Sequence, residues 1–292
     1  MALSAPFSGI SAPLSLDFKR IQFTPDLLPS DILGCNILQM MPDGERKMVF
    51  QPGAIFSNIL LADEINRASP KTQSAMLEAM QEHAVTLLGE TRPLPEPFFV
   101  LASQNPIELE GTYPIPEAQL DRFLFKIAVG GVDAGVLTEI IAHRRRGEPP
   151  QPSFRVSREE LAGLFDAMER IHLSEPVANY MARLVAAGHP GSPGALPEVE
   201  RFVTFGASPR AAIALAESAR AAALLAGRPS VGFEDVRSVA PAVLNHRLLL
   251  NYQARLEKVT SFDLIDLLLD KVDPAGLDLP KGVSLEAGEV RA

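Results

Sequence analysis

The sequence contains no tryptophan, a single cysteine and no long uncharged apolar run among its 292 residues. One cysteine excludes an intramolecular disulfide framework and a cysteine zinc cluster. Without a run of about 18 apolar residues, no transmembrane helix is expected. The first fifteen residues are uncharged, but Pro6 and Pro13 interrupt them and no basic segment precedes them, which argues against a signal peptide. The expected compartment is therefore the cytoplasm.

Positive charge is also scarce. The chain has 27 Lys and Arg against 36 Asp and Glu, a net charge of −9, and neither half is basic. Duplex nucleic acids are bound largely by neutralising phosphates with Lys and Arg, so no nucleic-acid partner is expected. Apolar residues make up 47% and charged residues 22% of the chain, proportions that indicate a folded globular protein and exclude a disordered or fibrous one.

A proline-rich stretch at residues 147–152 divides the chain into two parts. Its three prolines cannot continue a helix and are typical of a linker. Before it, apolar runs of strand length alternate with helical patterns, which predicts a parallel α/β domain over residues 1–150. After it nearly every segment has helical periodicity, which predicts an all-α domain over residues 151–292. The expected strands are residues 17–23, 58–62, 97–102 and 123–129, with a hairpin in 85–99 that turns at Gly89-Glu90.

Several helix starts are marked by capping residues. Ser69 followed by Pro70 predicts a helix between the second and third strands. Ser157 with Glu160 forms a capping-box pattern, and Ser208 precedes a long alanine-rich helix. Two further helices are expected over residues 233–247 and 261–272.

Two adjacent acids, Asp63 and Glu64, follow the apolar run at residues 58–62. A buried strand would deliver both carboxylates to its C-terminal end, where open α/β sheets bind their ligands. An aspartate there can hold Mg²⁺, directly or through water, beside the phosphates of a nucleotide. A glutamate there can orient and deprotonate an attacking water. The alternative is a strand end that simply meets solvent.

Asn105 and Arg122 stand at places where contacts to phosphate would be useful. Asn105 follows the next predicted strand and could bond a terminal phosphate or the attacking water, or it could form the turn before Pro106. Arg122 precedes the last predicted strand and could reach the phosphate of a neighbouring subunit. It could instead pair with Asp121 or Glu117.

Arg210 lies in the first turn of the helix that follows Ser208. A cation near a helix N-terminus is electrostatically unfavourable, which indicates a compensating partner such as a phosphate. The order of these polar residues along the chain is harder to attribute to chance than any one of them.

Several longer motifs resemble those of MoxR-type AAA+ ATPases. Residues 58–82, NILLADEINRASPKTQSAMLEAMQE, resemble the Walker B strand and the helix after it. The same family is resembled by LDFKRIQFTPDLLPSDILG at 16–34, FFVLASQNP at 98–106, GTYPIPEAQLDRFLFK at 111–126 and, in its lid, GASPRA at 206–211. The segments around residues 39–50 and 85–99 resemble the hairpin insertions of this clade. The resemblance covers nearly the whole chain.

The resemblance implies a role for each candidate residue. It implies Asp63 as the Mg²⁺-associated acid, Glu64 as the catalytic base, Asn105 as sensor 1, Arg122 as the arginine finger and Arg210 as sensor 2. ATP and Mg²⁺ are the implied cofactors. The implied assembly is a homo-oligomeric, hexameric ring that remodels partner proteins in a chaperone-like way or helps to insert metal cofactors. Proteins with von Willebrand A domains are implied partners.

One family motif is missing. The sequence contains no G-x-x-x-x-G-K-[ST] loop, whose backbone amides, lysine and hydroxyl hold the phosphates and Mg²⁺ in such enzymes. Residues 1–15 stand in its place and are too few to form a strand, a loop and a helix. Because the family's first strand is central in the sheet, its loss is expected to leave unpaired strand edges and to impair ATP binding.

These observations leave three interpretations open. The first is a MoxR-type ATPase in an N-terminally truncated form, which is favoured because the other catalytic side chains are all present. The second is a non-hydrolytic interaction subunit of an AAA+ ring. The third is a magnesium-chelatase-like subunit, which residues 66–82 fit less well than the MoxR type.

Overall fold

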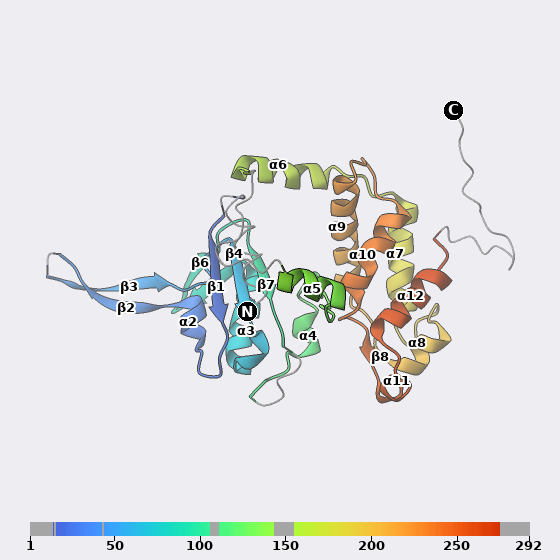
Figure 1. The fold of residues 1–292 in the computed structure, drawn as a ribbon. Helices are drawn as coiled ribbons and strands as arrows, with labels where there is room; N and C mark the ends of the chain where they lie inside the picture. Colours follow the sequence, from blue (N-terminus) through green and yellow to red (C-terminus); the bar gives the residue numbers. More distant parts are fainter. Residues whose placement is uncertain (1–13, 15, 43, 106–110, 143–154, 275–292) are drawn as a thin grey trace, which may run out of the picture. The chain divides into compact units, whose positions relative to one another are not determined.

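A computed structural model describes the chain except for residues 1–13, 15, 43, 106–110, 143–154 and 275–292 (Figure 1). The chain forms two compact units, which are treated separately below. The first comprises Met1–Phe123 and Ile127–Asp166, and the second comprises Leu124–Lys126 and Ala167–Ala292. The division thus falls after Asp166, whereas the proline-rich stretch at 147–152 lies outside the described residues.

A three-stranded parallel sheet lies at the centre of the first unit. Its order is β1 (Phe18–Gln22), β4 (Ile59–Asp63) and β7 (Phe99–Ala102). These strands confirm three of the four predicted ones. The middle strand β4 is buried along its apolar residues, with Leu60 and Ala62 fully inaccessible. Because only its last residue is polar, the strand can be buried without enclosing a charge.

Helices and a short turn of 3₁₀ helix complete the core around the sheet. They are α2 (Pro29–Leu33), η1 (Ile65–Arg67) and α3 (Pro70–Glu82). Ser69 caps α3 as predicted, because its Oγ accepts a hydrogen bond from the backbone N–H of Thr72. Met76 and Leu77 on α3 are fully buried in the cluster that also contains Ile65. This packing fixes the segment that follows β4.

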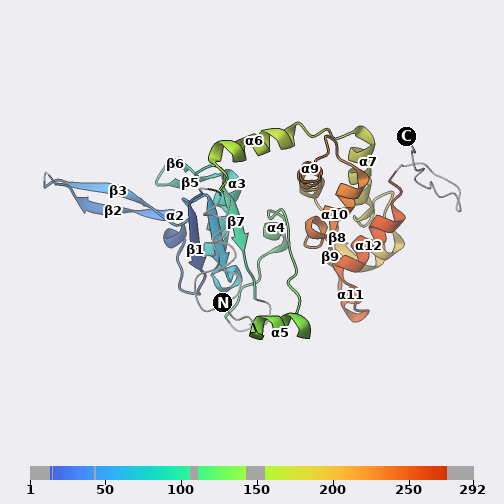
Figure 2. The same ribbon diagram turned by 45° about the horizontal axis from the view of Figure 1, so that its top comes forward.

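Two antiparallel hairpins extend the first unit. The longer one, β2 (Gly34–Met40) with β3 (Arg46–Pro52), projects away from the sheet in both views (Figures 1 and 2). The shorter one pairs β5 (Ala84–Leu87) with β6 (Glu90–Pro93). Its turn is Leu88-Gly89, one residue earlier than predicted. Both turn residues have positive φ, 53° and 82°, as a two-residue hairpin loop requires.

The predicted strand at residues 123–129 does not form, so this expectation is wrong. Its backbone is instead bonded within the second unit: Lys126 N–H donates to Ala242 O at 3.0 Å, and Asn245 Nδ2 donates to Lys126 O at 2.7 Å. The flanking elements are the short helices α4 (Glu117–Leu120) and α5 (Ala134–Ala142). Within the described residues β7 pairs on one side only, so the apolar run lacks the neighbouring strand that its pattern requires.

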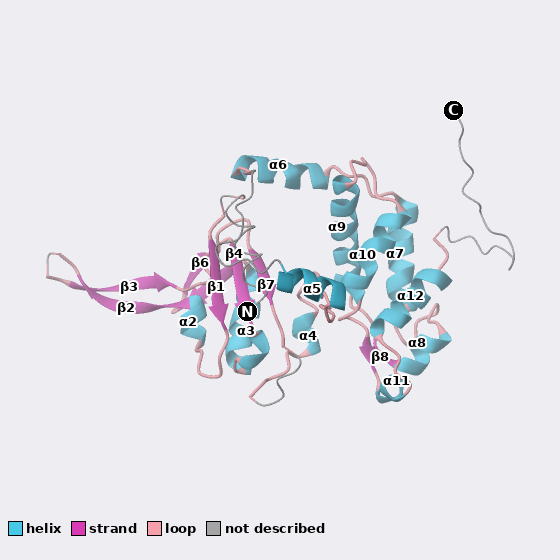
Figure 3. Cartoon of the chain, viewed as in Figure 1, coloured by secondary structure: helices cyan, strands magenta, loops and turns pink. Residues whose placement is uncertain are grey.

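The second unit is a helical lid; Figure 3 colours all helices of the chain cyan. The helices of this part of the chain, the first of which joins the two units, are α6 (Arg158–Glu169), α7 (Glu175–Ala187), α8 (Pro197–Phe202), α9 (Pro209–Leu225), α10 (Phe233–Leu244), α11 (Tyr252–Leu256) and α12 (Ser261–Lys271). The predicted capping box of α6 is present, since Ser157 N–H donates to Glu160 Oε2 and Glu160 N–H donates to Ser157 Oγ. Tyr180, Leu215 and Leu244 belong to its apolar core.

A short antiparallel ladder departs from the all-α expectation for the lid. It joins β8 (Val203–Phe205) to β9 (Leu249–Leu250). Two or three residues per strand are too few to give a recognisable alternation in the sequence. In a separate finding, no helix in the described ranges has the length and apolarity needed to cross a bilayer.

Gln73 provides a test of what holds the end of β4 in place. Its buried Nε2 donates to the carbonyl oxygens of Ile65, Ala68 and Tyr113 at 3.1–3.2 Å. Gln73→Ala is expected to lower the free energy of unfolding by about 2–4 kcal/mol, because it removes a fully buried side chain together with its hydrogen bonds to three carbonyls. Urea denaturation measures this. The exposed Gln81→Ala on the same helix is the control, and an equal loss in the two variants would contradict the interpretation.

Candidate functional site

Asp63 and Glu64 lie where the buried strand β4 reaches the surface. Asp63 is the last residue of β4, and its side chain is 18% exposed. Glu64 has a left-handed backbone, with φ 56° and ψ 49°, and leads directly into η1. This conformation is unfavourable for a residue with a side chain. It ends the strand abruptly and brings both carboxylates to the carboxyl edge of the sheet.

Both carboxylate oxygens of Asp63 accept hydrogen bonds. Ser103, which directly follows β7, donates from Oγ to Asp63 Oδ1 at 2.5 Å. Arg20 on β1 donates from Nη2 to Asp63 Oδ2 at 2.5 Å. Partial burial raises the pKa of Asp63, but the hydrogen bonds from Ser103 and Arg20 and the charge of Arg20 outweigh it and hold that pKa below its usual value. Asp63 is thus kept as an anion.

Glu64 is held by two donors that converge on one oxygen. Gln22, the last residue of β1, donates from Nε2 to Glu64 Oε2 at 2.8 Å. Arg67 on η1 donates from Nη1 to the same atom at 3.1 Å. The backbone N–H of Glu64 donates to Ser103 Oγ at 2.9 Å. Ser103 therefore contacts both acids and ties the end of β4 to the end of β7.

Asn105 lies two residues beyond Ser103, on the same edge of the sheet. Its carbonyl oxygen accepts a hydrogen bond from Nδ2 of Asn66 on η1 at 3.2 Å. The carbonyl oxygen of Ser103 also accepts one from the backbone N–H of Ile65 at 3.0 Å. The segment after β7 is therefore anchored to η1, and Asp63, Glu64 and Asn105 follow the ends of two adjacent parallel strands.

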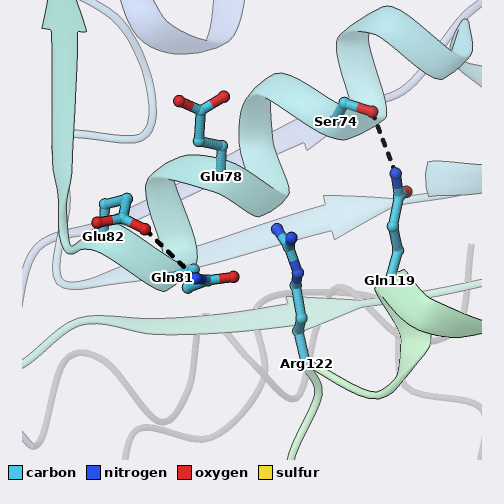
Figure 4. A pocket seen from close by; sticks show the side chains of 6 residues that line it. All are labelled: Ser74, Glu78, Gln81, Glu82, Gln119 and Arg122. Atoms are coloured by element: carbon cyan, nitrogen blue, oxygen red, sulfur yellow. Dashed lines mark hydrogen bonds between the residues drawn. The ribbon is translucent and has the colours of Figure 1, made fainter.

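Arg122 lies beside α3. It lines a pocket of about 270 Å³, and its side chain extends toward the helix (Figure 4). Arg122 Nη1 donates to Leu77 O at 3.1 Å. The other lining residues are Ser74, Glu78, Gln81, Glu82 and Gln119. The structure therefore groups this arginine with α3 and α4, and the finger role implied for it stays a prediction.

Arg210 belongs to the second unit, where it is the exposed second residue of α9. Ser208 caps this helix, since its Oγ accepts a hydrogen bond from the N–H of Arg210 at 3.2 Å. The predicted placement of Arg210 in the first turn is correct. Its sensor role stays a prediction, because Asp63 lies in the other unit.

The sequence reasoning missed four residues that contact the acids. They are Arg20, Gln22, Arg67 and Ser103. A signal was present for two of them: Arg20 and Gln22 alternate along a predicted strand and so lie on one face of it. Their contact with the acids depends on the pairing of β1 with β4, which places Gln22 opposite Asp63.

The acid pair fits a divalent cation of the Mg²⁺ type. Both carboxylates are partly exposed, and Mg²⁺ is usually held by one or two protein carboxylates plus waters and phosphates. Within the described residues, no group of three or more His, Cys, Asp or Glu forms a denser metal site. A phosphate cradle of the G-x-x-x-x-G-K-[ST] kind is absent from the sequence. The residues present therefore fit the cation but supply no such loop for the phosphates.

Comparison with known proteins gives consistent matches. Residues 4–125 match the ATPase family associated with various cellular activities (AAA), and residues 198–267 match the AAA lid domain. Chaperone MoxR1 of Mycobacterium tuberculosis is 44% identical over 255 residues, which cover 87% of this chain and 67% of that protein. The uncharacterised protein YeaC of Bacillus subtilis is 40% identical over 267 residues, which cover 90% and 79%.

A solved structure agrees with this. The crystal structure of a "putative ATPase" from Cytophaga hutchinsonii superposes with a TM-score of 0.85 at 39% identity, and covers 94% of this chain and 82% of its own. A parallel sheet with an acid pair at the end of its buried strand, followed by a helical lid, is the architecture of an AAA+ ATPase. The chain belongs to the MoxR family of AAA+ ATPases, and this favours the MoxR type over the magnesium-chelatase-like alternative.

Ser103→Ala tests the electrostatics of the site. A lowered folded-state pKa contributes stability above the unfolded-state value of about 3.9 and loses it as the pH falls through the folded-state value. Removing the hydroxyl raises the pKa of Asp63 toward normal, so the variant is expected to lose about 1 kcal/mol of stability at pH 7 and less at pH 3.

Urea unfolding at the two pH values measures this difference. Ser238→Ala is the control, because Ser238 Oγ donates to the neutral carbonyl of Asp235 at 2.7 Å and its loss should not depend on ionisation of an acceptor. An equal cost of Ser103→Ala at pH 7 and pH 3 would show that its bond to Asp63 does not depend on the charge of the acid.

Proposed function

We propose that Asp63 and Glu64 are the cation-binding and water-activating acids of a MoxR-type ATP-hydrolysing site. The observation that carries this proposal is their position at the carboxyl end of β4, bonded through Ser103 to the end of β7. Open α/β sheets bind ligands at this edge. A Mg²⁺ ion bound beside Asp63 would withdraw negative charge from the phosphate oxygens.

Asp63 and Glu64 would have different roles, because their surroundings differ. Asp63 is kept ionised by Ser103 and Arg20, as a cation ligand must be. Glu64, one residue further, would accept a proton from the attacking water through its carboxylate. Asn105 would orient that water or bond the terminal phosphate, and its segment is positioned for this by Asn66. Arg210 would contact phosphate from the lid.

In this chain the site is expected to bind ATP weakly. Asp63 and Glu64 act on a phosphate complex, but the loop that holds such a complex is not in the sequence. Each lost charged hydrogen bond to a phosphate removes about 1.5–3 kcal/mol, and micromolar affinity amounts to only about 8 kcal/mol.

The wider role proposed for the family site is mechanical. ATP hydrolysis in a homo-oligomeric, hexameric ring would drive chaperone-like remodelling of partner proteins or insertion of metal cofactors. Proteins with von Willebrand A domains are the proposed partners, and the cytoplasm is the proposed location. One relative, Chaperone MoxR1, carries the word chaperone in its name, which supports the first of these roles.

Calorimetric titration with ATP and Mg²⁺ tests the nucleotide site. The chain itself is expected to bind with a dissociation constant of about 1 mM or weaker, which corresponds to roughly 4 kcal/mol. A chimera that carries a strand, a G-x-x-x-x-G-K-T loop and a helix before Leu16 is expected to bind in the micromolar range. In that chimera Glu64→Gln should keep ATP binding and lower hydrolysis about 100-fold or more. Micromolar binding by the chain alone would contradict the requirement for the loop.

Subunit mixing tests Arg122 in the same chimera. Arg122→Ala subunits and Glu64→Gln subunits are each expected to be nearly inactive alone, because one lacks the finger and the other the base. When they are mixed, some interfaces join an intact Glu64 to an intact Arg122, so part of the ATPase activity should return. Phosphate release measures it. Normal hydrolysis by Arg122→Ala subunits alone would remove the finger assignment.

A further inference from the structure

Arg20 contacts Asp63 from the neighbouring strand. Its Nη2 donates to Asp63 Oδ2 at 2.5 Å and to Gln22 Oε1 at 3.1 Å. Arg20 and Gln22 are two residues apart on β1 and therefore lie on one face of the strand. Because Gln22 pairs with Asp63 in the parallel ladder, this face lies beside the acid.

The guanidinium occupies a position that a divalent cation needs. Oδ1 of Asp63 already accepts the hydroxyl of Ser103, and Oδ2 accepts Arg20. A cation that binds Oδ2 directly, or through a tightly held water, competes with Arg20 for this oxygen and is repelled by the positive charge of the guanidinium. The arginine side chain is 42% exposed and can move into water, where the loss of one partly exposed ion pair costs little.

A second set of bonds links Arg20 to the other acid. Gln22 accepts from Arg20 through Oε1 and donates through Nε2 to Glu64 Oε2 at 2.8 Å. The amide of Gln22 thus accepts a hydrogen bond from Arg20, which neutralises Asp63, and donates one to Glu64. When Arg20 leaves, the amide loses the bond that fixes its orientation, and its hold on Glu64 weakens.

We propose that Arg20 is the resident counter-cation of Asp63 and a positioning residue for Glu64. It neutralises Asp63 until a divalent cation replaces it, and its departure weakens the bond from Gln22, one of the two donors that hold Glu64 Oε2, so that Arg67 alone remains on that oxygen. This inference rests on the proposed function, in which Asp63 receives the cation and Glu64 meets the attacking water. Since binding is reciprocal, the bond from Gln22 to Glu64 in turn favours the cation-free arrangement.

Binding of Mn²⁺ to the chain in the absence of nucleotide tests the first part. The electron paramagnetic resonance signal of free Mn²⁺ measures the dissociation constant at pH 7. Arg20→Ala is expected to lower that constant about threefold to tenfold, because the competing cation is gone. A merely structural arginine would give the opposite effect, since a disturbed site binds the ion less well. Arg20→Lys keeps the charge and should stay close to the wild type.

Two further variants make the result specific. Arg201→Ala removes an arginine that is also 2.5 Å from its acid, Glu257, but lies in the lid. It changes the net charge by the same amount, so it should leave Mn²⁺ affinity unchanged. Asp63→Asn in the Arg20→Ala background should abolish the gain. An unchanged or lower affinity in Arg20→Ala, an equal gain in Arg201→Ala, or a gain that survives Asp63→Asn would each overturn the proposal. The same holds if Mn²⁺ binding is detected in neither the wild type nor Arg20→Ala.

Carbodiimide labelling of carboxylates, read by peptide mass spectrometry, tests the link to Glu64. Labelling of Glu64 is expected to be at least about twofold faster in Arg20→Ala than in the wild type, because one of the two hydrogen bonds to its Oε2 weakens while that from Arg67 remains. Labelling of Glu257 serves as the internal reference. An unchanged rate at Glu64 would overturn the positioning role. Neither the Mn²⁺ measurement nor the labelling uses ATP. If the nucleotide titrations contradict the proposed function, the results on Arg20 still stand. If the results on Arg20 are negative, ATP hydrolysis is still judged by the titrations.

Discussion

The burial of β4 between β1 and β7 is the constraint on which the site depends. Leu60, Leu61 and Ala62 are at most 2% exposed, and burying a leucine side chain contributes about 2 kcal/mol. A strand this apolar cannot slide by one residue without bringing Asp63 into the core, where an unpaired charge is very unfavourable. The register is therefore fixed, and with it the point at which the two carboxylates emerge.

Ser103 and Gln22 turn this edge into a connected site. Ser103 comes from β7 and contacts Asp63 and the backbone of Glu64, whereas Gln22 comes from β1 and contacts the side chain of Glu64. Asp63 is thus held by Arg20 on β1 and by Ser103 after β7, and Glu64 is held by Gln22 on β1 and by Arg67 on η1. Neither orientation depends on a single loop. Precise placement of this kind is what proton transfer and cation binding require.

Within the described residues β7 pairs on one side only, and the apolar residues after α4 do not form a strand. Residues 123–129 have the pattern of a buried strand, yet Ile127 is 76% and Val129 77% exposed. Strand formation also needs a partner with free backbone groups at the right place, and no such partner adjoins them in the described residues. The lid supplies hydrogen bonds to Leu124 and Lys126 instead.

The sequence by itself determined the elements whose causes are local. An alternating pattern specified β1, apolar runs specified β4 and β7, and Ser69, Ser157 and Ser208 specified the starts of three helices, because capping and hydrophobic periodicity depend on residues close together in the chain. The same runs predicted that Asp63, Glu64 and Asn105 follow strand ends. Only the tertiary structure decided which side chains form hydrogen bonds with Asp63 and Glu64. Arg20, Gln22 and Ser103 lie about 40 residues away in sequence, and their contacts follow from strand order and register, which are set by packing between distant segments.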